Sequence, residues 1–173
     1  MKNLLTPLVI ACALTLSARA ADVSTKISDV HLCCQSCVKG VQKAVADLKG
    51  VTATVDEDAE TVSLAGADAA TVQKAADALV AAGYFGTSSN PEIKLAASTG
   101  ASGKKVQTLK LEGVHLCCGK CVSAVDKAVK SVPGVKEQTA VKNAKTFEVT
   151  GDFNDKEVFD ALQKAGLTGK VAK

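Results

Sequence analysis

Cysteine and histidine residues are concentrated in two short, matching motifs. The first is HLCCQSC, from His31 to Cys37, and the second is HLCCGKC, from His115 to Cys121. Apart from Cys12, every Cys of the chain and both His lie in these motifs. A Cys that only fills a hydrophobic core has no reason to recur at a fixed spacing beside His, so packing alone explains the pattern poorly. We therefore interpret both motifs as chemical sites.

The spacing inside each motif favours the binding of a soft metal ion. Cys34 and Cys37 stand three positions apart at the beginning of an expected helix, so their side chains share one face and their sulfur atoms can converge. The amino terminus of a helix favours thiolate over thiol, and thiolate is the form that binds metals and attacks disulfides. Thiolates prefer cations such as Cu(I) and Zn(II), whereas Mg²⁺ and Ca²⁺ prefer oxygen ligands.

The two motifs belong to two copies of one longer unit. Residues 30–45 and 114–129 agree at 11 of 16 positions, which indicates internal duplication. The segment between the copies, residues 89–104, is rich in Ser, Gly and Ala and is expected to be a flexible linker. We therefore expect one domain over residues 22–88 and a second over residues 105–173.

The same local signals follow one another in each copy. A segment with alternating apolar residues precedes the motif, and a helix with one apolar stripe of Val and Leu follows it. Two β-rich segments, a second helix and a last short strand complete the unit. The expected strands are 23–27, 51–55 and 61–64 in the first copy and 106–111, 135–141 and 146–149 in the second, and the expected second helices are 70–82 and 155–165.

The βαββαβ order predicts the fold class. Each helix has one apolar face that needs a partner, which an antiparallel four-stranded sheet covered on one side by two helices provides. We therefore predict an α+β protein with two ferredoxin-like domains in tandem. Aromatic residues make up only 3% of the chain, so the cores must be built from Val, Leu and Ala.

These features resemble the heavy-metal-associated domain family over nearly all of residues 22–173. The resemblance rests on the βαββαβ order, the Cys-x-x-Cys that opens the first helix, the Gly-Val that follows it, and the AGYF sequence at residues 82–85. The family occurs in copper chaperones and in amino-terminal modules of metal-transporting P-type ATPases. The resemblance implies a non-enzymatic protein that binds Cu(I), Zn(II) or a related ion, and a metal-transporting ATPase or another metallochaperone as its partner. The implied ligands are Cys34 with Cys37 and Cys118 with Cys121.

The motifs also depart from the family loop, which reads Gly-Met-x-Cys-x-x-Cys. Leu occupies the Met position in both copies, at Leu32 and Leu116, and we expect these side chains to pack inward. The loop is about two residues longer than the family pattern. In the second copy, Leu167 replaces the aromatic residue found at Tyr84. The potential ligands that the family loop lacks are His31, Cys33, His115 and Cys117.

The additional residues leave the metal and the ligand set open. Three Cys and one His would complete a tetrahedral zinc site, whereas two or three thiolates satisfy Cu(I) without His. Adjacent side chains diverge on an extended backbone, so Cys33 is either a third ligand or a bridge to a second ion. His31 either binds the ion or fixes the loop through a hydrogen bond to a carbonyl or a thiolate. The two motifs bind either one ion each or one shared ion.

Redox chemistry is the alternative function. Cys-x-x-Cys at a helix start is also the active centre of thiol–disulfide oxidoreductases, and an exported protein meets an oxidising environment in which Cys34 and Cys37 could form a disulfide. The surrounding element order of a thioredoxin-like domain is missing, however, so metal binding is the better interpretation.

The amino terminus predicts export. Residues 1–20 combine an apolar run from Leu4 to Leu16 with the small-residue triplet Ala18–Ala20, the pattern of a cleaved secretory signal. We therefore expect a periplasmic or secreted protein. VIAC, ending at Cys12, resembles a bacterial lipobox, and only lipidation there would attach the protein to a membrane. The net charge of +3 gives no reason to expect a nucleic acid partner.

Overall fold

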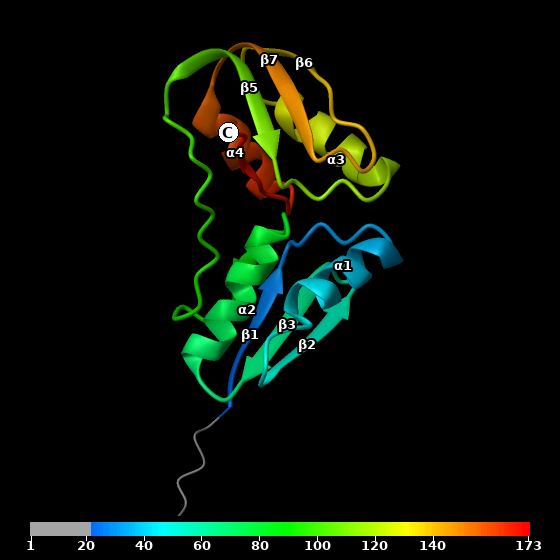
Figure 1. Ribbon diagram of the computed structural model, residues 1–173, viewed down its shortest axis with the longest axis vertical. Helices are drawn as coiled ribbons and strands as arrows, with labels where there is room; N and C mark the ends of the chain where they lie inside the picture. The colour runs from blue at the N-terminus through cyan, green and yellow to red at the C-terminus, as the bar shows by residue number, and fades with distance from the viewer. Residues whose placement is uncertain (1–21) are drawn as a thin grey trace, which may run out of the picture.

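A computed structural model of the protein describes residues 22–173, which form two βαββαβ units (Figure 1). The first unit comprises β1 (Val23–Ser28), α1 (Gln35–Val45), β2 (Val51–Asp56), β3 (Thr61–Gly66), α2 (Ala69–Ala81) and β4 (Thr87–Ser88). The second comprises β5 (Lys105–Glu112), α3 (Gly119–Lys130), β6 (Val135–Gln138), β7 (Thr146–Asn154), α4 (Asp155–Lys164) and β8 (Lys170–Val171).

The sheets have the predicted topology. Strands are ordered β2-β3-β1-β4 in the first unit and β6-β7-β5-β8 in the second, and all neighbouring strands are antiparallel. Two helices pack against each sheet. The predicted α+β class, with two ferredoxin-like units in tandem, is therefore confirmed.

The apolar stripes of the first helices face the two cores. Val41 of α1 and Val125 of α3 are fully buried. Leu32 and Leu116, at the position where the family loop carries Met, are 2% and 4% exposed and pack inward as expected. Burial of these Leu side chains anchors each motif to the core of its own unit, which fixes the loop that carries the Cys residues.

The second unit differs from the predicted strands between β6 and β7. β6 ends at Gln138 instead of continuing to residue 141, and Val141 is 62% exposed. The chain turns through Asn143, which has a positive φ of 63°, and the Asn143 N–H donates a 2.7 Å hydrogen bond to the carbonyl of Leu116. Asn tolerates this left-handed conformation better than most residues. The turn thereby supports the backbone of the second motif.

Residues 89–104 connect the two units along one side of the molecule (Figure 1). Near the first unit, the Gln73 side chain forms hydrogen bonds with the backbone N–H and carbonyl of Lys94. Near the second, the Asp155 carboxylate accepts hydrogen bonds from the backbone N–H groups of Ser102 and Gly103. The segment is thus attached at both ends, while its flexibility and the predicted domain boundaries stay predictions.

The two units meet through the segments that follow α2 and α4. Tyr84 and Leu167 form an antiparallel β-bridge, in which the Thr168 N–H donates to the Gly83 carbonyl at 2.9 Å and the Phe85 N–H donates to the Gly166 carbonyl at 3.1 Å. These segments occupy corresponding positions in the two copies. The contact therefore relates the units by an approximate two-fold axis, which brings the two motifs to the same side of the interface.

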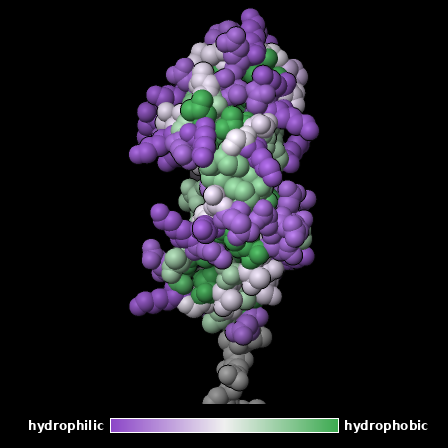
Figure 2. Space-filling view, turned by 90° about the vertical axis from the view of Figure 1, so that its right-hand side faces the viewer, coloured by the Kyte–Doolittle hydropathy of each residue, from purple (hydrophilic) through white to green (hydrophobic). Residues whose placement is uncertain are grey.

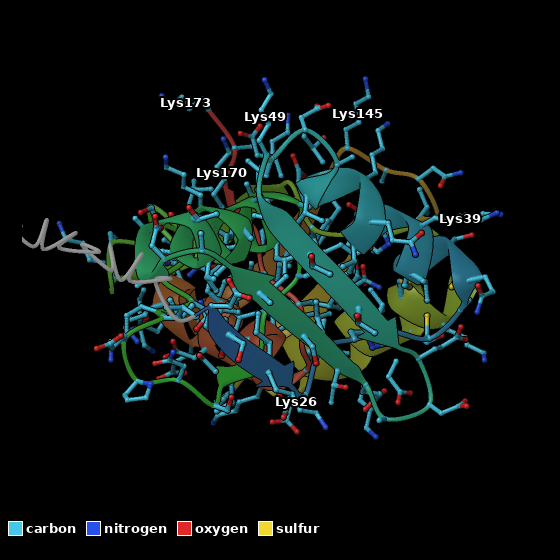
Figure 3. All side chains as sticks on the ribbon, turned by 90° about the horizontal axis from the view of Figure 1, so that it is seen from below. Lys26, Lys39, Lys49, Lys145, Lys170 and Lys173 are labelled. Carbon is cyan, nitrogen blue, oxygen red and sulfur yellow. The ribbon has the colours of Figure 1, made fainter. Side chains whose placement is uncertain are left out.

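The surface reflects this arrangement. On the face shown in Figure 2, hydrophilic residues cover most of both units, and hydrophobic residues form a band where the units meet. Lysine side chains such as Lys26, Lys39 and Lys49 project outward around the periphery of the molecule (Figure 3). The residues of the cluster described below lie between the units.

The predicted signal at residues 1–20 and the possible lipidation site Cys12 lie outside the described residues. Within residues 22–173, no helix combines the length and the hydrophobicity that crossing a bilayer requires.

Candidate metal centre

The first helices begin directly at the Cys-x-x-Cys pairs. Cys34 is the N-cap of α1 and Cys118 is the N-cap of α3, both with extended backbone (φ −173° and −150°). An N-cap side chain usually accepts a hydrogen bond from the first turn of its helix, but neither sulfur does so here. Each Cys pair converges as expected, with Sγ–Sγ distances of 3.9 Å from Cys34 to Cys37 and 3.8 Å from Cys118 to Cys121.

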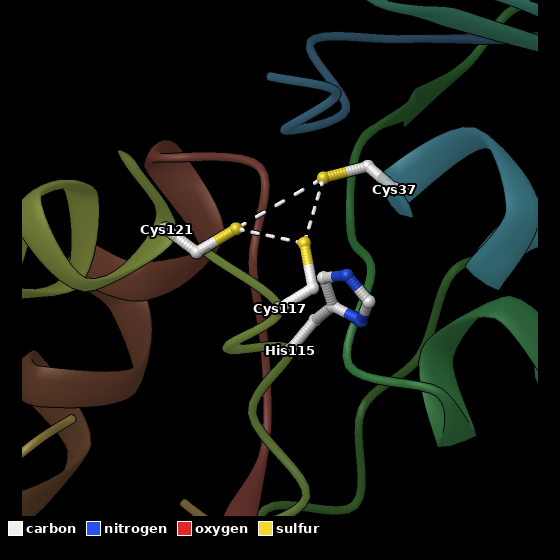
Figure 4. Close-up of side chains that lie close together, drawn as sticks. All are labelled: Cys37, His115, Cys117 and Cys121. Atoms are coloured by element: carbon white, nitrogen blue, oxygen red, sulfur yellow. Dashed lines mark hydrogen bonds between the residues drawn. The ribbon is translucent and has the colours of Figure 1, made fainter. Parts of the chain in front are cut away.

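The sulfur atoms of the two motifs gather in one place. Across the interface, Cys37 Sγ lies 3.9 Å from Cys121 Sγ and 3.5 Å from Cys117 Sγ (Figure 4). Cys37 and Cys121 are fully buried, the other cluster Cys are half-buried, and all are free thiols. We call this group the six-sulfur cluster; its members are Cys33, Cys34, Cys37, Cys117, Cys118 and Cys121.

The Cys residues that the family loop lacks form most of the links between the units. Cys33 Sγ lies 3.4 Å from Cys118 Sγ and 3.5 Å from Cys121 Sγ. In the corresponding positions, Cys117 Sγ lies 3.7 Å from Cys34 Sγ and 3.5 Å from Cys37 Sγ. The side chains of Cys33 and Cys34 thus contact different cysteines of the opposite motif. Cys33 and Cys34 nevertheless belong to the same cluster, because the cysteines that they contact in the opposite motif lie close to one another.

The two histidines occupy unequal environments. The Tyr84 hydroxyl donates a 2.9 Å hydrogen bond to the Cys37 carbonyl and lies 3.1 Å from His115 Nε2, with the two rings 4.5 Å apart. Because the hydroxyl proton is engaged by the carbonyl, we assign His115 Nε2 as the donor to the Tyr84 oxygen. His31 Nε2 is buried and has no hydrogen-bond partner among the described residues.

Sequence analysis did not identify Tyr84 as part of the site. Its position in the AGYF sequence was noted only as a family feature. The signal that could have identified it is the pairing of this lone Tyr with Gly40. A Cβ at Gly40 would overlap with the Tyr84 hydroxyl, so the glycine of α1 leaves room for it.

The ligand atoms are close enough to hold metal ions in several combinations. Within each of three groups, the potential ligand atoms all lie within 4.8 Å of one another. Each group draws on both motifs, so no group is confined to one unit. The groups are Cys37 with His115, Cys117 and Cys121; His31 with Cys33 and Cys121; and Cys33 with Cys34 and Cys118.

Hydrogen bonds inside the cluster favour thiolates at two positions. The Cys121 thiol donates to the Cys37 sulfur, which lowers the pKa of Cys37 and raises the pKa of Cys121. At Cys118, burial acts to raise the pKa, but the nearby backbone N–H of Cys121 and the Cys33 thiol outweigh it and lower the pKa to about 6. Burial raises the pKa of Cys33 and Cys117. Each motif therefore supplies one thiolate ready to accept a cation.

Two polar neighbours of the cluster, His31 and Tyr84, are kept neutral by burial. Burial lowers the pKa of His31, which favours the neutral imidazole that can bind a metal. Burial, followed by the Cys37 thiolate, raises the pKa of Tyr84 and keeps its hydroxyl protonated. The negative charge of the site therefore resides on sulfur, as a site for soft cations requires.

Comparison with known proteins identifies the repeated unit. Residues 24–85 and 108–168 each match the model of the heavy-metal-associated domain. Over 154 residues, the chain is 30% identical to the copper-transporting ATPase 2 of Rhizobium meliloti (strain 1021), an alignment that covers 87% of this chain and 17% of the ATPase. The chain thus spans about a sixth of the length of this relative.

Two solved structures are also similar. The N-terminal domain of PacS from Synechocystis PCC6803 is 26% identical, and the match covers 39% of this chain and 100% of that chain with a TM-score of 0.35. The N-terminal soluble domains of Bacillus subtilis CopA are 15% identical, and the match covers 88% of this chain and 95% of that chain with a TM-score of 0.34.

Proposed function

Because the chain belongs to the heavy-metal-associated domain family, in two tandem copies, we propose that it binds a soft metal ion, Cu(I) or Zn(II), and sequesters it or transfers it to another protein by ligand exchange. In this role the metal is cargo, and the protein is not an enzyme. A hydrophobic core that merely contains Cys explains the cluster less well, because thiols that only fill a core would not need to recur at matched positions in both units.

The convergence of sulfur atoms between the units is the observation that carries this proposal. Thiolates bind Zn(II) at about 2.3 Å, so two thiolates on one ion lie at most about 4.6 Å apart. The Sγ–Sγ distances between Cys37 and Cys121, 3.9 Å, and between Cys33 and Cys118, 3.4 Å, are within this limit. Little movement is therefore needed to bind an ion between the units.

Ligand exchange is proposed to begin at the half-buried thiols. Cys34 and Cys118 lie at the ends of the cluster, and Cys117 lines a groove of about 640 Å³ together with His115 and Leu116. A thiolate of an acceptor protein could approach there and replace one sulfur at a time. A metal-transporting ATPase or another metallochaperone is the proposed partner; the name of the matched Rhizobium meliloti protein supports the first choice.

Thiol–disulfide exchange is the second candidate. Two observations favour it: the lowered pKa of Cys118 and the closeness of Cys118 to Cys121. A thiolate can attack a disulfide to form a mixed disulfide, and a neighbouring thiol can then release the product by attacking that mixed disulfide. We rank it below metal binding because the cluster brings together more thiols than a dithiol reaction uses.

We propose that the protein acts outside the cytoplasm, in the periplasm or the medium. The secretory pattern of residues 1–20 supports this proposal. Mass spectrometry of the protein from fractionated cells tests it. A mature chain that begins after Ala20 supports export, a lipid-modified Cys12 indicates a membrane anchor, and an intact amino terminus in the cytoplasm contradicts both.

Anaerobic metal titration tests the function. The reduced protein is titrated with Cu(I) or Zn(II) in competition with a chromophoric chelator, while free thiols are counted. We expect stoichiometric binding that protects the thiols. The double variant Cys37→Ser with Cys121→Ser removes both buried sulfurs and is expected to weaken metal binding at least about 100-fold. Loss of a residue that only orients a metal ligand typically costs about 10–100-fold.

The matched control is Ser36→Ala, which alters an exposed residue beside Cys37 and should leave metal affinity unchanged. Failure of the wild-type protein to compete for either metal would contradict the proposal. Catalytic reduction of a disulfide substrate by the metal-free protein would favour the redox alternative.

A further inference from the structure

We propose that the two units share one multinuclear Cu(I)–thiolate cluster, in which Cys33 and Cys117 bridge copper ions bound by opposite motifs. This inference rests on the proposed function and specifies its cargo and its stoichiometry. It differs from one ion held by each Cys-x-x-Cys pair, because the bridging ligands are the Cys residues that the family loop lacks.

The first argument is the number of sulfurs in one place. A tetrahedral Zn(II) site uses four ligands, and one Cu(I) uses two or three thiolates. A single ion of either kind would leave cluster members unused, although all of them lie within 3.4–3.9 Å of at least two others. Thiolate sulfur has several lone pairs and can bind two copper ions at once. Bridging therefore engages every member of the cluster.

The second argument is the arrangement of the sulfurs. They form three-membered groups in which each pair of Sγ atoms is 3.4–3.9 Å apart, and neighbouring groups share an edge of two sulfurs. The four groups are Cys34–Cys37–Cys117, Cys37–Cys117–Cys121, Cys33–Cys37–Cys121 and Cys33–Cys118–Cys121.

The spacing of each group fits a three-coordinate ion. Three thiolates arranged in a plane around a metal at about 2.3 Å would lie about 4.0 Å from one another. The distances within the cluster, 3.4–3.9 Å, approach this value and need to expand by at most about 0.6 Å. Each group is thus a candidate Cu(I) site, and the cluster has room for about four ions by this count of groups.

The third argument is the symmetry of the links. Cys33 contacts Cys118 and Cys121, and Cys117 makes the corresponding contacts with Cys34 and Cys37. Without Cys33 and Cys117, the only sulfur link between the units that remains within residues 22–173 is the 3.9 Å contact of Cys37 with Cys121. These two residues therefore decide whether the motifs act as one site or as two.

Two double variants separate the shared cluster from independent sites. Both remove two sulfurs from corresponding positions. Cys33→Ser with Cys117→Ser removes the bridges but keeps each Cys-x-x-Cys pair. Cys34→Ser with Cys118→Ser removes the end members but keeps two three-sulfur groups in the centre. The probe is Cu(I) alone, added anaerobically to the full chain, and the readouts are ions bound per chain and copper–copper scattering in X-ray absorption.

We expect the wild-type chain to bind more than two Cu(I) ions and to show copper–copper scattering. The variant without Cys33 and Cys117 should bind two ions without that scattering. The variant without Cys34 and Cys118 should keep the scattering with fewer ions. These paired results support the inference, because only the shared cluster depends on the bridging positions.

Other outcomes overturn the inference in distinguishable ways. Two ions per chain without copper–copper scattering in the wild type would establish independent sites and leave the proposed function intact. One ion per chain would establish a mononuclear shared site and would also contradict only the inference. No stoichiometric binding of Cu(I) or Zn(II) would overturn both the inference and the proposed function.

Discussion

At the scale of single residues, Tyr84 makes the two halves of the site unequal. Its hydroxyl connects the carbonyl of Cys37 to Nε2 of His115 across the interface. The corresponding residue of the second copy, Leu167, has no hydroxyl, and His31 Nε2 is left without a hydrogen-bond partner among the described residues. His115 is therefore held in place before metal binds, whereas His31 can turn toward an ion near Cys33.

Replacement of Tyr84 by Phe tests this connection. Loss of the hydroxyl removes its buried hydrogen bond to the Cys37 carbonyl and leaves the half-buried His115 Nε2 unpaired, which we expect to lower the free energy of unfolding by about 1–3 kcal/mol. Gly40→Ala should be destabilising in the wild type, because the new Cβ would overlap with the Tyr84 hydroxyl. In the Phe variant the cost of Gly40→Ala should fall by more than about 0.5 kcal/mol, the usual limit of additivity. Urea unfolding measures each value.

The second copy supplies the control for this cycle. Ala124 stands at the position that corresponds to Gly40. Ala124→Gly should cost about 1 kcal/mol, the ordinary penalty of Gly in a helix, with or without the Tyr84 hydroxyl. Strictly additive costs for Gly40→Ala and Tyr84→Phe would show that the hydroxyl does not require the glycine.

At the scale of elements, the first helices position the cluster by packing. α1 and α3 each begin at a Cys of the motif and bury a stripe of Val against the sheet of their own unit. Cys37 and Cys121 lie on the same buried face as these Val residues, so the stripe that stabilises the helix also aims a sulfur at the interface. The apolar stripe is local in sequence, which is why it was predictable, as were the element order and most strand bounds.

A carboxylate in this stripe is expected to unfold the unit that contains it. Val41 and Val125 are fully buried, and Asp at either position would face the core without a partner. We expect a loss of more than about 3 kcal/mol, within the range for an uncompensated buried charge. Circular dichroism and two-dimensional NMR of Val41→Asp and Val125→Asp measure the result, which should be loss of native signals from one unit.

Exposed positions of the same helices provide controls. Gln42→Asp in α1 and Ser123→Asp in α3 introduce the same charge on the solvent side and should change stability by no more than about 0.5 kcal/mol. Native spectra for Val41→Asp or Val125→Asp would contradict the packing of these helices.

At the scale of the whole molecule, close approach of the backbones creates the shared site. A Cβ at Gly83 would collide with the carbonyl of Gly113 and the N–H of His115, and a Cβ at Gly166 would collide with the corresponding groups of Asp29 and His31. Glycine at these positions lets the units approach closely enough for the Tyr84–Leu167 bridge. The cluster therefore depends on residues that carry no metal-binding chemistry.

Gly83→Ala is expected to separate the two units. The variant should increase the radius of gyration in small-angle scattering and lower the number of Cu(I) ions bound, because sulfur contacts across the interface are lost. Gly50→Ala is the matched control, since Gly50 has a similar positive φ (75° against 87°) but nothing within 4 Å of the added Cβ. Both substitutions strain the backbone by about 1–2 kcal/mol, and only the first affects the interface.

Equal scattering profiles and equal copper stoichiometry for the two glycine variants would contradict the role assigned to the interface.

The sequence by itself determined the repeat, the order of the elements, the burial of Leu32 and the convergence of Cys34 with Cys37. Each of these follows from local spacing, which fixes helix faces and strand alternation within a few residues. The turn at Asn143, the role of Tyr84 and the links from Cys33 and Cys117 to the opposite motif were decided only by the tertiary structure. These contacts join groups far apart in the chain, and their geometry depends on how closely two folded surfaces can approach, which no local pattern encodes.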